Sequence, residues 1–207
     1  MHTRTARYFT AAATALALLA ALAASSSARS FSTTSQTLRT TFTRLEFTNE
    51  LGFGTVSCLL TLEGSFHSRT IAKTAELIGA ITRVDVRRPC TGGEGIPRTE
   101  TLPWHVTYSG FVGALPNITG LIALLSRIRL DISLPGTCDG EYGSATDNIR
   151  GTVTREAGGA LTTNEPSGDR ISLIRTNSGI CPSRSGFRGN ASLTALNSAS
   201  RITITLI

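Results

Sequence analysis

One histidine and two charged residues upstream of it are the residues of this chain best suited to acid–base chemistry. His105 lies in the segment "TLPWHVTYSG", and Arg83 and Asp85 lie in an earlier segment of alternating apolar and charged residues. A histidine with a carboxylate partner can act as a general base or bind a ligand near neutral pH. If the two segments are neighbouring antiparallel strands with odd positions opposite odd positions, Asp85 or Arg83 lies across from His105. These three residues form the candidate surface site, although a solvated surface pair of little energetic value is the favoured interpretation.

The sequence offers little other chemistry. It contains no G-x-S-x-G elbow, no H-E-x-x-H motif, no phosphate-binding loop and no dinucleotide fingerprint. The acidic segment "CDGEYGSATDN" carries Asp139, Glu141 and Asp147, but it lacks the spacing of a calcium-binding loop, so a solvated turn is favoured over a metal site. The sequence therefore predicts no metal and no cofactor, and it favours a protein that is not an enzyme.

The cysteines point to structural disulfides. No C-x-x-C pair occurs, which favours disulfides in an oxidising compartment over metal binding or redox chemistry. The alternation around them favours Cys58 with Cys90 and Cys138 with Cys181 among the possible connectivities. Setting the first pair opposite each other also sets Leu60 opposite Arg88, so the register agrees with the burial pattern only in part. The same construction for the second pair sets Ile149 opposite Arg170, a poorer match.

The N-terminus has the form of a secretory signal. A basic start, an uncharged run of Ala and Leu and a small polar end occupy residues 1–28, too short and too weakly flanked for a stable membrane span. Cleavage after Ala28 is favoured over cleavage after Ala23. Residues 29–36, rich in Ser and Thr, are expected to be a flexible leader. Residues 37–207 then form a single secreted domain with no membrane span in the mature chain.

Alternation of apolar and polar residues predicts that this domain is all-β. "IRLDISL" and "RITITLI" both place apolar side chains on one face and polar side chains on the other. Clusters of Gly, Pro, Asn and Ser separate the segments. Many short strands of this kind predict a single antiparallel sandwich or barrel with two disulfides. The other expected strands are residues 38–47, 56–62, 78–87, 149–155, 171–176 and 187–196.

Two segments fit more than one element. Residues 70–77 are compatible with a helical turn or with a strand. Residues 121–128 place leucines at helical spacing but also fit a buried strand, which is favoured.

The segment at residues 101–120 predicts a strand with an extra residue. Trp104 and Tyr108 fall on even positions, whereas the next large apolar residue, Phe111, is odd. Because a slip of one residue turns side chains to the other face, a β-bulge at Ser109 and Gly110 would keep both sets in the core. The prolines at positions 103 and 116 are then expected at the two ends of the strand.

The charge pattern argues against nucleic acid as a partner. The chain has 20 Lys and Arg against 14 Asp and Glu, a formal net charge of +6. Apart from the pair Arg87 and Arg88, the basic residues are scattered and not interleaved with aromatic residues, as they are in nucleic-acid-binding surfaces.

Several segments together carry a resemblance. These are "SCLLTLEGSFHSRTIAK" with Cys58, Phe66 and Lys73, then Cys90, then "TLPWHVTYSGFVGALPNITG". Over residues 56–138 the chain resembles a group of uncharacterised secreted β-rich proteins of GC-rich Gram-positive bacteria. The resemblance implies export and a β-rich domain, and it implies no activity and no catalytic residue.

The expected function is therefore a secreted, non-enzymatic β protein of the extracellular space or cell envelope, acting on a ligand of unknown identity through residues presented on its scaffold. The alternative is a secreted hydrolase that uses His105 with a nearby carboxylate.

Overall fold

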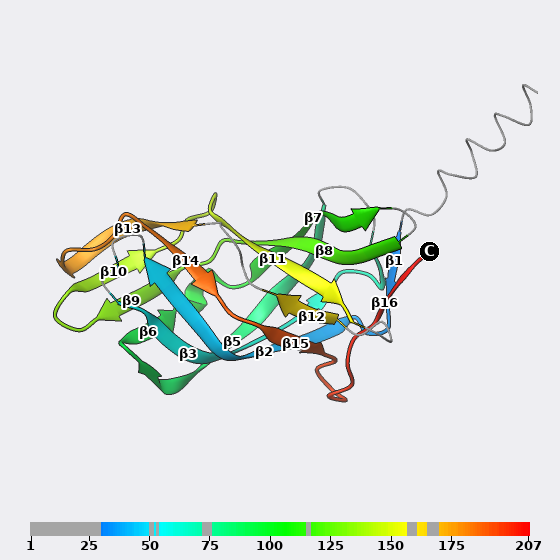
Figure 1. Cartoon of the computed structure of the whole chain (residues 1–207), viewed down its shortest axis with the longest axis horizontal. Helices are drawn as coiled ribbons and strands as arrows, with labels where there is room; N and C mark the ends of the chain where they lie inside the picture. The colour runs from blue at the N-terminus through cyan, green and yellow to red at the C-terminus, as the bar shows by residue number, and fades with distance from the viewer. Residues whose placement is uncertain are drawn as a thin grey trace, which may run out of the picture.

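The computed structural model describes residues 30–49, 52, 54–71, 76–114, 117–156, 161–164 and 170–207, and these are almost entirely antiparallel β-structure with one short 3-10 helix (Figure 1). This confirms the all-β prediction. The predicted signal peptide lies outside the described residues. No helix in the described ranges is long and apolar enough to cross a membrane. The elements are β1 (Phe31–Thr33), β2 (Thr37–Asn49), β3 (Val56–Phe66), β4 (Thr70–Ile71), β5 (Leu77–Thr91), β6 (Glu94–Pro97), η1 (Thr99–Thr101), β7 (Trp104–Ala114), β8 (Asn117–Ser126), β9 (Leu130–Leu134), β10 (Cys138–Tyr142), β11 (Asn148–Arg155), β12 (Leu161–Asn164), β13 (Arg170–Gly179), β14 (Arg184–Arg188), β15 (Ala191–Thr194) and β16 (Ile204–Leu206).

Eight of the strands close a ring. From β2 the antiparallel pairings run through β3, β5, β7, β8, β11, β12 and β15. The last of these, β15, pairs back with β2. We call these eight strands the ring. Closure leaves an interior that, at eight strands, is either filled by side chains or large enough for one small ligand.

The remaining strands of the large sheet extend the molecule beyond the ring. Residues 39–42 of β2 pair with β15, whereas residues 46–49 pair with β14. From β14 the sheet continues through β13, β10 and β9 to β6. These five strands, here called the arm, lie at the left end of the elongated molecule in Figure 1. The expected strand at residues 187–196 is thus two strands, because its first part pairs in the arm and its second part in the ring.

Each part has its own apolar core. The ring encloses one buried cluster that includes Phe42, Leu62 and Trp104. The arm covers a second cluster, in which Phe47 packs edge-on against Tyr142 with 5.2 Å between ring centroids. The Tyr142 hydroxyl donates a hydrogen bond to the carbonyl of Pro182 at 3.1 Å, and burial raises the pKa of this tyrosine. The long strands β2 and β3 contribute to both clusters and join the two parts.

A small separate sheet closes one end of the ring, and it corrects the expectation of a flexible leader. Residues 31–33 form β1, which pairs with β16 on one side and β4 on the other. Phe31 is 2% exposed and packs edge-on against Tyr108, with 5.7 Å between ring centroids. We call β1, β4 and β16 the cap. Phe31 therefore attaches this Ser- and Thr-rich segment to the core of the ring.

Both predicted disulfides are present, Cys58–Cys90 and Cys138–Cys181. The expected register beyond the first pair is wrong, because a β-bulge between residues 57 and 59 shifts it and Leu60 faces Val86 instead of Arg88. The shift removes the apolar-to-charged mismatch that the unbulged register implies.

The expected pairing of Ile149 with Arg170 is also wrong. Ile149 lies on β11 in the ring, where it faces Leu125 of β8. Arg170 begins β13 in the arm, where it faces Gly186 of β14. The second disulfide therefore ties β10 to the segment after β13, within the arm.

The segment at residues 101–120 folds largely as predicted. A register shift falls between Tyr108 and Gly110 in the pairing of β7 with β8, at the position where the bulge is expected. Trp104 is 3% exposed and Tyr108 is 1% exposed, and Phe111 packs against the same core. Pro103 directly precedes β7, whereas Pro116 lies outside the described residues. The favoured strand at residues 121–128 is confirmed by β8.

Candidate functional site

The structure separates the three residues of the predicted surface site. His105 faces Ala80 of β5, and its Nε2 lies 3.1 Å from a guanidinium nitrogen of Arg127. Asp85 faces Thr61 of β3. A register shift between residues 77 and 79 of β5 brings an even position opposite His105, and the pairing of β5 with β7 ends at Ile81. The expectation that Asp85 lies across from His105 is therefore wrong.

Arg83 is occupied elsewhere. Its guanidinium lies 3.5 Å from Oε2 of Glu63, and Oε1 of the same carboxylate accepts a hydrogen bond from Arg39 at 2.8 Å. The partner that the structure gives to His105 is thus a cation, and the dyad on which the hydrolase alternative rests is not assembled among these residues. In the described part of the chain, no group of three or more His, Cys, Asp or Glu side chains is placed to hold a metal ion.

Two cavities are lined mainly by residues of the ring. The larger one has a volume of about 160 Å³ and sits beneath the cap, against Thr33, Ile71 and Ile204. Well-packed protein interiors have few voids larger than a water molecule, so a space of this size is more than packing alone requires. Its other lining residues are Leu38, Thr40, Phe42, Leu62, Phe66, Ile78, Ile81, Val106, Leu121, Ala123, Leu125, Ile149, Gly151, Val153 and Leu193.

A second cavity, of about 100 Å³, lies between the ring and the arm. Trp104 forms part of its wall together with residues of β3, β6 and β9. Its other lining residues are Phe42, Leu45, Phe47, Val56, Cys58, Leu60, Leu62, Val86, Gly95, Pro97, Leu125, Ile128, Leu130, Ile132, Ile149 and Phe187. Phe42, Leu62, Leu125 and Ile149 line both cavities. The two spaces are therefore neighbours, separated by shared side chains.

The walls of both cavities are almost entirely hydrocarbon. Among the described lining residues, the side-chain hydroxyls belong to Thr33 and Thr40, and none of the linings includes an ionisable side chain. Cys58 is present as a disulfide. Hydrocarbon walls of this kind favour apolar molecules of matching size.

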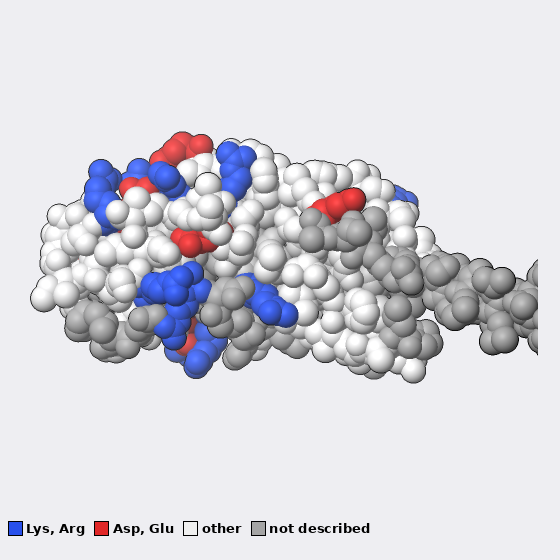
Figure 2. Space-filling model, turned by 90° about the horizontal axis from the view of Figure 1, so that it is seen from above, with Lys and Arg blue, Asp and Glu red and all other residues white. Residues whose placement is uncertain are grey.

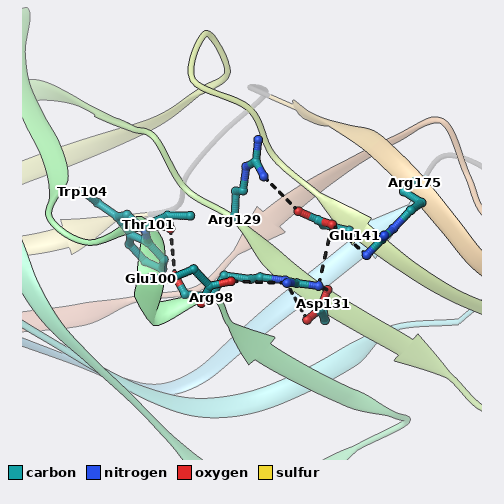
Figure 3. Close-up of polar contacts among 8 residues, drawn as sticks. All are labelled: Arg98, Glu100, Thr101, Trp104, Arg129, Asp131, Glu141 and Arg175. Atoms are coloured by element: carbon teal, nitrogen blue, oxygen red, sulfur yellow. Dashed lines mark hydrogen bonds and ion pairs between the residues drawn. The ribbon is translucent and has the colours of Figure 1, made fainter.

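A chain of hydrogen bonds fixes the wall of the smaller cavity from outside (Figure 3). The indole nitrogen of Trp104 donates to the hydroxyl of Thr101 at 3.0 Å, and this hydroxyl donates to the carbonyl of Arg98 at 2.8 Å. The backbone nitrogen of Arg98 donates to the carbonyl of Arg129 at 2.9 Å. The short helix η1 is thus tied both to the cavity wall and to the segment before β9.

The side chain of Arg98 continues this network. Its Nη2 donates to Asp131 at 2.9 Å and its Nη1 donates to Glu100 at 3.3 Å, and these two bonds raise its pKa above the ordinary value. Asp131 lies on the outer face of β9. Leu130 and Ile132, on either side of it in the same strand, line the cavity. Alternation along β9 therefore separates the charged network from the apolar space.

Glu141 is the buried centre of the network, which corrects the expectation of a solvated turn at residues 138–148. It lies in β10, is 6% exposed, and its carboxylate lies 3.2 Å from Arg129, 3.4 Å from Arg175 and 3.7 Å from Arg98 (Figure 3). Asp131 and Arg175 face it from the two neighbouring strands. The alternation of residues 138–142 places Glu141 opposite the inward face, but its partners depend on strand order, which the sequence does not display.

Asp147 has a structural role in the same segment. Its carboxylate accepts hydrogen bonds from the backbone nitrogen of Ser172 at 2.9 Å and from the Ser172 hydroxyl at 3.3 Å.

On the face seen in Figure 2, most of the visible Lys and Arg atoms lie over the half of the molecule that holds the arm. Charge is thus concentrated around the arm, whereas the ring presents a mostly uncharged surface on that face.

The comparisons with known proteins add no family to this description. No family model, curated protein or solved structure matches the chain.

Proposed function

We propose that this chain is a secreted, non-enzymatic protein of the extracellular space or cell envelope that binds an apolar small molecule inside the ring. The observation that carries the proposal is the pair of adjoining cavities with hydrocarbon walls. A cavity of about 150 Å³ is large enough to bind benzene, and the larger cavity here matches that volume. The predicted signal peptide and the two disulfides support an extracellular location, because disulfides persist in oxidising compartments.

The volumes indicate the size of the ligand. By the same scale, the two cavities together have room for about ten carbon atoms of an aliphatic chain. The four side chains that line both cavities stand between them, so a ligand that occupies both must displace some of these rotamers. Unbranched or small-ring hydrocarbon groups fit such a space better than large rigid ring systems.

The walls favour binding over catalysis. A reaction at the ligand would need a nucleophile or an acid–base group in contact with it. The described linings offer two threonine hydroxyls and no ionisable side chain. Burial of apolar surface then supplies the affinity, at about 0.8 kcal/mol for each methylene.

Filling the space is expected to weaken binding. In Leu125→Trp, the larger side chain occupies room at the junction of the two cavities. The affinity for 1-decanol, measured by titration calorimetry, should fall at least tenfold, because losing room for two methylenes already costs about 1.6 kcal/mol. Ile174→Trp makes a similar change at an exposed position of β13 outside both linings and should leave the affinity unchanged.

A second filling variant distinguishes loss of space for the ligand from loss of folding. Ala123→Leu adds a smaller volume to the lining of the larger cavity alone, and it should weaken 1-decanol binding while the thermal unfolding curve stays cooperative. Unchanged affinity in both filling variants, or no binding by the unmodified protein, would contradict the proposed function.

A further inference from the structure

The strand β5 leaves one side unpaired where it passes the smaller cavity. It pairs with β3 along most of its length, but with β7 only as far as Ile81. The next strand in the chain, β6, pairs with β9. In the described part of the chain, therefore, no strand pairs with residues 82–88 on the side away from β3. We call the boundary between these residues and β6 the seam.

The smaller cavity lies against the seam. Val86 lines it from β5, and Gly95 and Pro97 line it from β6. Val86 is only half-buried although it shares the cavity wall with fully buried residues. Gly95 contributes no side chain, and the nearest atoms to a Cβ built there are Ile132 Cδ1 at 3.5 Å and Cys58 Sγ at 3.7 Å. Val86, Gly95 and Pro97 therefore form a part of the cavity wall in which β5 and β6 are not joined by strand pairing.

Two arginines follow Val86 directly in the sequence. Arg87 and Arg88 are both exposed, and within the described residues neither makes an ion pair or a side-chain hydrogen bond. At about 3.3 Å per residue along a strand, Arg88 begins about 7 Å from Val86. Strict alternation would turn Arg87 away from the face of Val86, but a register shift in the pairing with β3 falls at residues 87–91. Other arginines near the cavity are engaged, since Arg83 contacts Glu63 and Arg98 contacts Asp131.

Two carboxylates lie near these arginines in the sequence without pairing with them. Asp85 on β5 and Glu94 on β6 are the carboxylates nearest in sequence to the two arginines, and both are exposed. No ion pair joins either of them to Arg87 or Arg88 among the described residues. The guanidinium forks are thus available to a planar anionic group, which arginine binds through two parallel hydrogen bonds.

We infer that the ligand is a single-chain anionic amphiphile, whose apolar chain enters the ring at the seam and whose head group is bound by Arg87 and Arg88. This inference rests on the proposed function and specifies its ligand class. The arrangement leaves the charged head in water at the surface, where it avoids the cost of burying an ion, and places the chain among hydrocarbon side chains. It also gives a role to the one pair of adjacent arginines in the sequence.

The test compares two ligands of equal chain length. Decanoate and 1-decanol differ in head-group charge at pH 7.5, so the ratio of their affinities reports on the arginines. The unmodified protein is expected to bind decanoate more tightly than 1-decanol. In Arg87→Gln/Arg88→Gln, decanoate affinity should fall about five- to tenfold, the range expected for two solvent-exposed charge pairs, while 1-decanol affinity stays the same.

The matched control removes the same charge from another face. Arg150 and Arg155 are exposed on β11 and line neither cavity, so Arg150→Gln/Arg155→Gln should leave both affinities unchanged. Equal affinity of the unmodified protein for the two ligands would overturn the inference and leave the proposed function standing. So would an equal loss of decanoate affinity in the two double variants, because it would reflect net charge alone. Failure of the unmodified protein to bind either ligand would overturn the proposed function itself, and the inference with it.

Discussion

Phe31→Ala is expected to lower the free energy of unfolding by about 3–4 kcal/mol, the range for removing a buried phenylalanine. Phe31 is 2% exposed, and its ring packs edge-on against Tyr108 of the ring. It is also the residue of β1 that faces Ile71 of β4 and Leu206 of β16. Truncation therefore loosens the contact between the cap and the ring as well as leaving a void.

Urea unfolding followed by the fluorescence of Trp104, the single tryptophan of the chain, measures this change. Ser32→Ala is the matched control, because Ser32 lies between the two inward residues of the same strand and is only half-buried. It should change the free energy of unfolding by no more than about 0.5 kcal/mol. A loss below about 1 kcal/mol in Phe31→Ala would mean that β1 is not packed on the ring.

Removing the second disulfide should have a similar effect. Cys138→Ala/Cys181→Ala opens a loop defined by a sequence separation of 43 and is expected to lower the free energy of unfolding by about 3 kcal/mol, mainly by enlarging the unfolded ensemble. Cys138 is also 3% exposed in the core of the arm, so its truncation adds a packing loss.

The same urea titration, performed without reductant, measures the disulfide variant. Thr137→Ala changes a half-buried neighbour of Cys138 in the turn before β10 and should shift the free energy of unfolding by no more than about 0.5 kcal/mol. If the double variant matched this control, the bond would carry no stability and the arm would be held by its apolar core alone.

Features that depend on local alternation were predictable from the sequence. The bulge between Tyr108 and Gly110 follows from a change in the parity of large apolar residues within one strand. Parity also favoured the pairing of Cys58 with Cys90, since both lie with inward apolar residues, although the register expected around them was wrong. The bulge needs no knowledge of which distant strands are neighbours.

Features that depend on distant pairing were not predictable in this way. Closure of the ring joins β2 to β15, where the Thr194 hydroxyl donates to the carbonyl of Arg39 across a sequence separation of 155. The cavities exist only because of that closure, and most of their lining residues look like ordinary core residues in the sequence.

Two expectations, one on the candidate surface site and one on the acidic segment, failed for related reasons. His105 and Asp85 were expected to face each other from parity alone, but a bulge in β5 and the early end of its pairing with β7 separate them. Glu141 was expected in a solvated turn because glycines occur on both sides of it in the sequence. Its partners lie on β9 and β13, which the local sequence does not show. Each outcome was decided by non-local strand order.

Methyl NMR during a titration with 1-decanol shows whether an apolar ligand binds inside the ring. The methyl signals of Leu62, Leu125 and Ile149, which line both cavities, are expected to shift together and saturate. The methyl signals of Ile174 and Ile180, which are 42% and 71% exposed, should stay in place. Shifts confined to these two surface residues, or no shift at Leu62, Leu125 and Ile149 up to the solubility limit of the alcohol, would contradict binding inside the ring.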